Sequence, residues 1–400
     1  MRFTLLALIL CAPLGAQTLA VKGGTVYTMA GPAIRDGVVI VRDGKIERVG
    51  PAASTPIPAG MKTLTAKVVT PGLIDAHSTV GLSGALNQVH DQDKLEKSAP
   101  IQPELRAIDA YNAKDPLVSW LRSFGVTTIH TGHGPGALIS GQTMVVKTTG
   151  GTGEADMVKA AAMVAASLGE AGRAEGGKSP GSRAKMIAML RAEFIKAKEY
   201  AEKAAKAEKG KEPARDLRQE ALGKILSGEL PLMVTVNKAN DILAALRLGK
   251  EFGLKIVLDG AAEAPLVLDE IKASGYPVFV HPTMARPTRD AEALSLETAS
   301  KLKAAGIPFA IPSGFEGYVP KTRVILFEAA LAAANGLTQE QALEAITITP
   351  ARLLGIEARV GSIAPGKDGD LALYDGDPLE YTTHAVGVVI GGKVVSELER

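Results

Sequence analysis

The chain has 400 residues, of which 46% are hydrophobic and 4% aromatic, so it is long enough to bury one large domain and a small companion. Its formal net charge is only +2. No long run of Lys or Arg is interleaved with aromatic residues, which excludes a nucleic-acid partner from the prediction.

The first residues have the pattern of an export signal. Arg2 precedes an apolar run from Leu5 to Leu10, and small residues follow up to Ala16. Because this run is too short to span a bilayer, we predict a cleaved signal peptide over residues 1–16 and a periplasmic or secreted mature chain. A buried N-terminal strand is the alternative. The single cysteine, Cys11, lies in the signal, so neither disulfides nor thiolate metal sites are predicted, and no later segment predicts a membrane span.

Both ends of the mature chain are rich in short strands. Residues 17–67 contain apolar runs separated by Gly, Pro or Asp-Gly, which is the pattern of strands joined by tight turns. Residues 358–400 repeat this texture, with strands expected at 370–374 and 386–390 and a Gly391-Gly392 turn. We therefore predict one small β-sandwich built from both ends.

The middle of the chain, residues 68–357, alternates apolar strands with helices. This alternation is typical of a parallel α/β architecture, and eight such units make a (β/α)8 barrel with its chemistry at the C-terminal ends of the strands. Seven strands are clear, and they are expected at residues 68–75, 125–129, 143–147, 232–236, 255–259, 277–280 and 307–311. An eighth is placed near residues 161–167, a stretch that reads equally well as helix.

A helical insertion is predicted at about residues 151–228. Its second part is rich in Ala, Lys and Glu at helical spacing, with breaks at Gly210 and Pro213. The charges along Glu193–Lys211 are interpreted as a solvated helix face, with a partner-binding surface as the alternative.

Two motifs carry a resemblance to a known family. The run 71–77, Pro-Gly-Leu-Ile-Asp-Ala-His, resembles the opening of the amidohydrolase superfamily barrel. The tail, with Thr349-Pro350-Ala351-Arg352 and then the run 360–371, is similar to the closing signature of that superfamily. The similarity is greatest to its exported, imidazolonepropionase-like branch. It implies a (β/α)8 barrel, a flanking β-sandwich, and hydrolysis of non-peptide amide or cyclic amide C–N bonds by a hydroxide bound to zinc or another divalent metal.

The resemblance also implies where the metal ligands would stand. The family has His-x-His after strand 1, Lys or Glu at strand 4, His at strands 5 and 6, and Asp at strand 8. Here the matching positions are His77 and Thr79, then Glu170, Asn237, Gly260 and Gly314. Neutral Thr and Asn are weak zinc ligands, and Gly has no side chain. We therefore predict no bound metal and an impaired ancestral mechanism.

The alternative to a chain without metal is a metal site rebuilt from other residues at the same end of the barrel. His77, His133, Asp259 and His281 are expected at the barrel end where catalysis belongs, together with His130. The simpler interpretation places His130 and His133 in loops, His281 at a strand end, and His77 in a hydrogen-bonded core position.

Three functions remain open from the sequence. The first is a non-catalytic relative, which binds an amide-like small molecule or pairs with an intact amidohydrolase. The second is a hydrolase with a relocated or metal-free site. The third is a structural subunit of a larger complex. A homo-oligomer is also compatible with the sequence. The substrate is not readable from the pattern of the loops.

Overall fold

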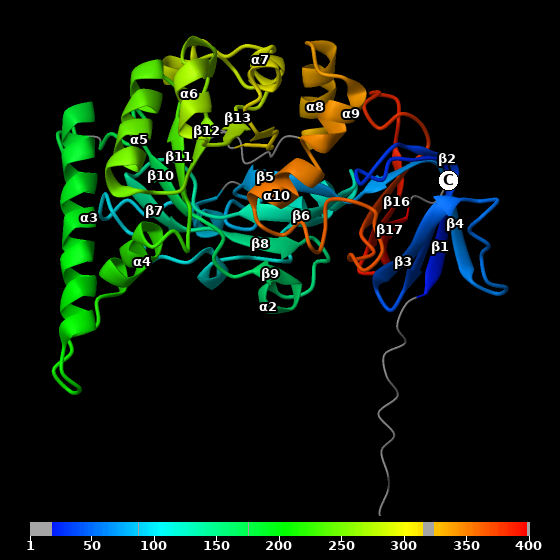
Figure 1. Ribbon diagram of the computed structural model, residues 1–400, viewed down its shortest axis with the longest axis horizontal. Coiled ribbons are helices and arrows are strands. Elements are labelled where there is room, and N and C mark those ends of the chain that lie inside the picture. The colour runs from blue at the N-terminus through cyan, green and yellow to red at the C-terminus, as the bar shows by residue number, and fades with distance from the viewer. Residues whose placement is uncertain (1–17, 87, 175, 315–323, 398–400) are drawn as a thin grey trace, which may run out of the picture.

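The computed structural model describes residues 18–86, 88–174, 176–314 and 324–397. The predicted signal peptide, residues 1–16, lies outside the described residues. A large sheet made of both ends of the chain stands at one side of the molecule, and an α/β body occupies the rest (Figure 1). The protein therefore has an α/β fold with mixed sheets.

The sheet made of the chain ends has seven strands. In spatial order these are β17 (Lys393–Glu397), β16 (Ala385–Ile390), β15 (Leu371–Tyr374), β4 (Lys62–Pro71), β1 (Leu19–Val26), β2 (Ile34–Arg42) and β3 (Lys45–Pro51). The two ends meet where β15 pairs antiparallel with β4, from Leu371 opposite Pro71 to Tyr374 opposite Val68. Between β2 and β3 the turn residues Asp43 and Gly44 have φ of 52° and 75°, the conformation that a tight hairpin requires.

The body contains two further sheets. One has the strand order β14 (Phe309–Ala310), β13 (Val278–Val280), β12 (Ile256–Gly260), β11 (Leu232–Val236), β10 (Val164–Ser167) and β7 (Ile139–Gln142). From β10 to β14 its neighbours are parallel, and β7 is antiparallel to β10. The other has the order β5 (Leu73–Ser78), β6 (Val126–Thr131), β8 (Met144–Lys147) and β9 (Met157–Lys159).

Strands β8 and β10 lie in the two segments for which the sequence-based expectation was wrong or open. The strand expected at residues 143–147 is β8, but it runs antiparallel to β6 instead of forming another parallel unit. No long helix separates β6 from β8, and without a crossover helix a strand returns antiparallel to its neighbour. The ambiguous stretch 161–167 contains a strand, β10, whose four residues are all buried.

Some helices stand beside the six-stranded sheet, and others lie beside the four-stranded sheet or toward the sheet made of the chain ends (Figure 1). The helices are α1 (Pro116–Arg122), α2 (Gly153–Asp156), α3 (Arg183–Lys206), α4 (Leu217–Leu226), α5 (Ala239–Phe252), α6 (Leu268–Ser274), α7 (Thr298–Ala305), α8 (Ile325–Ala334), α9 (Gln339–Glu344) and α10 (Ile348–Leu353). Short 3-10 turns lie at Val89–Asp91, Ala107–Asp109, Ala264–Leu266 and Arg289–Ala291. Helices α5, α6 and α7 each end at a glycine with φ between 68° and 75°, a left-handed cap that returns the chain to the next strand.

One face of the body strands forms an apolar cluster of its own. Met233, Val257, Phe279 and Ala310 come from four neighbouring parallel strands, and they pack with residues of the segment 351–360. Above this cluster, toward the ends of the strands, the same faces carry polar residues such as Thr235 and Asp259. Among the helices of the described residues, none is both long and apolar enough to cross a membrane.

Candidate functional site

A buried polar group joins β5, β11 and β12. His77, near the end of β5, places Nδ1 2.9 Å from Oδ1 of Asp259 in β12. Thr235 is the neighbour of Asp259 in β11 and donates its hydroxyl to Oδ2 of Asp259 at 2.7 Å. Both His77 and Asp259 are buried. Each oxygen of the Asp259 carboxylate thus has a partner, and the His77 ring is fixed in orientation.

The two partners shift each other's protonation. Burial alone raises the pKa of Asp259, but the charge of His77 and its hydrogen bond outweigh burial and hold the pKa below its usual range. Burial likewise lowers the pKa of His77, and Asp259 outweighs it in the opposite direction. The pair is therefore best described as an imidazolium beside a carboxylate.

A second carboxyl group lies two residues before His77. Asp75 accepts hydrogen bonds through Oδ1 from the backbone N–H of Ser313, at 2.9 Å, and of His77, at 3.3 Å. Burial raises the pKa of Asp75 to about 6 in spite of these bonds. Among the described residues, Oδ2 of Asp75 and Nε2 of His77 are buried and have no hydrogen-bond partner.

The positions matched to the family's ligands converge around His77. The backbone N–H of Gly314 donates to the carbonyl of His77 at 3.1 Å. Gly260 directly follows Asp259, and a Cβ built on it would lie 2.8 Å from Oδ1 of Asn237. Thr79 is buried two residues after His77. Gly314 thus contacts His77 directly, while Gly260 and Asn237 lie close to each other at the ends of neighbouring strands.

The groups at these positions do not fit a divalent metal. Nδ1 of His77 already pairs with Asp259, which leaves one ring nitrogen. Gly260 and Gly314 have φ of 84° and 69°, and a Cβ on Gly314 would lie 2.4 Å from Cγ of Pro282, so a larger side chain meets strain and an occupied space. Zinc takes three or four His, Cys or carboxylate ligands. Within the described ranges, no three such side chains are arranged to hold a metal.

Glu170, matched to the strand-4 ligand, lies elsewhere. It follows β10 by three residues, its side chain is 43% exposed, and Oε1 pairs with Nη1 of Arg289 at 3.0 Å. The His77 side chain, by contrast, is 4% exposed. The structure therefore does not bring Glu170 to the buried group.

His130 and His281, two candidates for a relocated site, bind other groups through both ring nitrogens, and His130 lies in the buried strand β6 instead of the expected loop. Nδ1 of His130 lies 2.6 Å from the carbonyl of Ala76, and Nε2 lies 2.6 Å from Oγ1 of Thr143. Burial, together with the neighbouring charge of His77, lowers the pKa of His130 to about 3. His281 is bound to the Pro282 carbonyl and to Thr298, and burial lowers its pKa to about 4.

His133 is a different case, because neither ring nitrogen has a hydrogen-bond partner among the described residues. Burial lowers its pKa to about 4. The ring packs against Gly141, where an added Cβ would lie 2.4 Å from its Cδ2 atom. Of the relocated candidates in the described residues, His77 and Asp259 share a hydrogen bond, and the ring of His130 lies 6.2 Å from that of His77.

Sequence reasoning did not single out Asp75, Thr235 or Ser313. A usable signal existed for two of them, because Asp75 and Thr235 each lie two residues from a matched position, His77 and Asn237, and alternate residues of a strand share a face. Ser313 acts through its backbone N–H, for which the sequence carries no signal.

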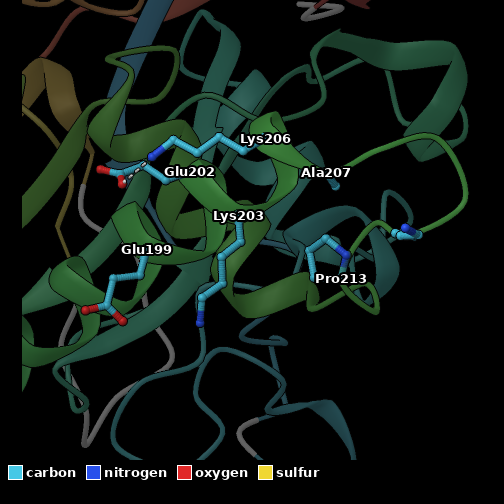
Figure 2. A pocket seen from close by; sticks show the side chains of 7 residues that line it. Glu199, Glu202, Lys203, Lys206, Ala207 and Pro213 are labelled. Carbon is cyan, nitrogen blue, oxygen red and sulfur yellow. Dashed lines mark ion pairs between the residues drawn. The ribbon is translucent and has the colours of Figure 1, made fainter.

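A shallow hollow lies at the C-terminal end of α3, at the edge of the molecule away from β5 (Figures 1 and 2). Its volume is about 500 Å³, and it is lined by Glu199, Glu202, Lys203, Lys206, Ala207, Lys211 and Pro213. Lys206 pairs with Glu202 at 3.6 Å, and both side chains are more than two-thirds exposed (79% and 68%). These charges are paired with one another in water and do not converge on a ligand position.

Comparisons with known proteins agree with this architecture. Residues 313–396 match the amidohydrolase family Amidohydro_3. Imidazolonepropionase from Rhizorhabdus wittichii is 28% identical over 380 residues, which cover 87% of this chain and 91% of that protein. Amidohydrolase tasK from Hapsidospora irregularis is also 28% identical, over 89% of this chain but only 39% of that longer protein.

Solved structures extend the likeness to the fold. An amidohydrolase from Thermotoga maritima has a TM-score of 0.89 at 28% identity, covering 95% of this chain and all of that one (100%). A zinc-bound adenosine deaminase from Xanthomonas campestris has a TM-score of 0.56 at 16% identity, over 96% of this chain and 93% of that one, and shows the fold alone. The chain is thus similar over most of its length to amidohydrolases, with imidazolonepropionase among the relatives, and its last quarter matches an amidohydrolase family model.

Proposed function

We propose that this protein is a catalytically impaired amidohydrolase that does not hydrolyse C–N bonds through a bound metal. The observation that carries the proposal is the lack of ligands beside His77: the positions matched to strands 6 and 8 are Gly260 and Gly314, whose φ of 84° and 69° and close neighbours disfavour a metal-binding side chain. Hydrolysis by this family needs a metal that lowers the pKa of its bound water to about 7. One free imidazole nitrogen beside two glycines does not hold such a metal.

The proposal includes a (β/α)8 barrel, a β-sandwich made of the chain ends, and export to the periplasm or outside the cell. Closure of the body strands is supported by two backbone bonds that reach β5. Gly314 N donates to the His77 carbonyl at 3.1 Å, and Ile74 N donates to Ile346 O at 2.9 Å. Export rests on the pattern of residues 1–16, and mass measurement of the mature N-terminus tests it.

The role proposed for the retained fold is binding. The expected partner is a small amide-like molecule, or a related amidohydrolase that keeps its metal-binding residues. The reason is that the chain keeps the fold of the family at the strand ends but lacks most of the metal-binding side chains. Co-purification from the source organism distinguishes a protein partner from a small ligand.

One observation favours a second candidate, a metal-free hydrolase. A carboxylate that fixes a histidine through Nδ1 and leaves Nε2 unbound is the arrangement of a general base, and Nε2 of His77 has no partner among the described residues. In this candidate the neutral form of His77, present above its raised pKa, would take a proton at Nε2 from water attacking an amide carbonyl.

Hydrolysis assays separate the two candidates. The full chain is incubated with cyclic amides, including imidazolonepropionate, and with simple amides, in chelator and with added zinc or manganese. We expect no turnover in any condition. Turnover that requires metal would overturn the proposal. Turnover in chelator that is lost in Asp259→Asn and His77→Gln, but kept in the exposed control Asp269→Asn, would establish the metal-free hydrolase instead.

A further inference from the structure

The segment between β13 and α7, residues 282–297, forms a surface loop with a closed base, here named the flap. Nε2 of His281, just before the flap, lies 3.0 Å from Oγ1 of Thr298, just after it. Near its start, Thr283 donates its hydroxyl to the buried carboxylate of Glu328 at 2.6 Å. A loop of this length whose ends are tied together can move as one unit about its base.

Charged side chains hold the tip of the flap, residues 289–292, to the body. Nη1 of Arg289 lies 3.0 Å from Oε1 of Glu170, in the turn after β10. Oε1 of Glu292 lies 2.5 Å from Nζ of Lys238, just before α5. The tip therefore docks on two separate connections of the body.

Asp290 supplies the most buried of these contacts, with a side chain that is 20% exposed. Its Oδ2 accepts from the backbone N–H of Glu170, and its Oδ1 lies 3.5 Å from Nη2 of Arg183. A Cβ on Gly169 would lie 2.7 Å from Oδ2 of Asp290, so glycine permits this approach. The contacts of the flap with the body thus include a defined binding position for the Asp290 carboxylate.

Apolar burial contributes little to holding the flap. Of its large apolar side chains, Met284 and Leu296 are 48% and 43% exposed, and Leu294 is half-buried. Arg289 adopts φ of 52°, a conformation that is unfavourable for a non-glycine residue and that needs outside contacts to persist. Exposed ion pairs are individually weak and are screened by salt, so the closed state depends on ionic strength.

We propose that the flap is an electrostatic clasp over the strand ends, which opens when its ion pairs are screened or removed. At its base, Pro282 fills the space beside Gly314, whose N–H binds the His77 carbonyl. Opening the flap therefore uncovers His281 and the approach to the buried group, whether or not the protein has any catalytic activity.

Hydrogen exchange read by mass spectrometry tests the clasp on the full chain. Raising NaCl from about 0.05 M to about 1 M should speed exchange in flap peptides several-fold, because the Debye length falls from more than 10 Å to about 3 Å. Peptides from α5 should not change. Glu170→Lys and Arg289→Glu should each reproduce the effect at low salt, and the double variant should restore slow exchange. Glu251→Gln, which removes an exposed pair with Arg191 elsewhere, is the matched control.

Labelling of histidine by diethyl pyrocarbonate gives a second readout. We expect modification of His281 to rise with salt in parallel with flap exchange, while His130, inside the body, stays protected. Flap exchange that ignores salt, or a double variant as fast as the singles, would show that ion pairs do not close the flap. Unchanged His281 labelling while the flap exchanges faster would show that opening does not reach the base.

Discussion

At the scale of single residues, the proposal that the metal centre is lost rests on His77 and on the residues at the matched positions around it. His77 keeps its place, but Asp259 holds one of its ring nitrogens at 2.9 Å. The two glycines matched to family ligands, Gly260 and Gly314, adopt positive φ, which suits glycine and resists restoration of a side chain.

Gly314 gives the sharpest test at this scale. Gly314→Ala should lower the free energy of unfolding by about 1–2 kcal/mol for its positive φ, plus about 1–3 kcal/mol for the contact with Pro282. Gly253→Ala is the matched control, since Gly253 has φ of 68° against 69° for Gly314, and no atom lies within 4 Å of the added Cβ. Urea unfolding of both variants measures the difference. Equal losses would show that the space beside Gly314 is not filled.

The family motifs in the sequence predicted which positions to compare, and the structure places most of them together around His77. They did not predict that Asp259 would bind Nδ1 of His77, because the two residues lie in different sheets, and sequence spacing does not fix which residues of separate sheets meet. Glu170 shows the same limit. A loose match in a turn after β10 did not predict that the side chain would face solvent and pair with Arg289.

At the scale of elements, a buried ion cluster connects the seven-stranded sheet to the body. Nζ of Lys147 in β8 bonds with Oδ2 of Asp370 and lies 3.2 Å from Oδ2 of Asp368. Lys147 and both carboxylates are nearly buried. Lys147→Met should therefore cost about 3–5 kcal/mol, because it leaves buried charge without its partner.

The control for Lys147 is a second substitution. Lys147→Met combined with Asp370→Asn should recover part of the loss, since the amide no longer needs a cation and its oxygen can still accept from Gly391 N. Chemical unfolding of the two variants decides this. A double variant less stable than Lys147→Met alone would contradict the assignment.

The chain ends supply a further test of connected elements. Deleting residues 370–400 removes β15 and leaves β4 as an open edge, with the apolar partners of Leu371 and Leu373 exposed. We expect aggregation on size-exclusion chromatography, with the full chain as the control. A truncated protein that is soluble, monomeric and unchanged in melting temperature would show that the ends do not stabilise each other.

The sequence predicted whether a segment is helix or strand where the hydrophobic periodicity was strong. It did not predict whether a strand runs parallel or antiparallel to its neighbour. The pattern of residues 143–147 predicted a strand correctly, but the same alternation suits parallel and antiparallel neighbours. The connection after β6 contains β7 and no crossover helix, and β8 returns antiparallel to β6. For residues 161–167, small apolar residues favour helix and strand alike, and tertiary pairing with Leu232–Val236 selects the strand.

At the scale of the whole molecule, buried neutral histidines make stability depend on pH. Burial lowers the pKa of His130 to about 3 and those of His133 and His281 to about 4. The unfolded chain, with histidine pKa near 6.5, binds more protons below that pH. The contribution of these three histidines to stability is therefore fully present above about pH 6.5 and falls as the pH is lowered toward 4, whereas Asp75, with its pKa raised to about 6, contributes in the opposite direction.

Replacing His133 measures its share of the pH dependence of stability. His133→Leu should lose little at neutral pH, because neither ring nitrogen has a partner among the described residues. It should also reduce the loss between pH 6.5 and about 4 by up to about 3 kcal/mol. Urea unfolding across this range is the measurement, with His384→Gln, whose side chain is 59% exposed, as the control. An unchanged pH slope in His133→Leu would contradict the assignment.

The metal content of the purified chain tests the central claim most directly. The full protein is expressed in medium supplemented with zinc and manganese, purified without chelator, and measured by elemental analysis against protein concentration. Because His77 is paired with Asp259 and the other matched positions lack strong ligands, we predict a metal content far below one equivalent per chain. One tightly held metal ion in every chain would contradict the account.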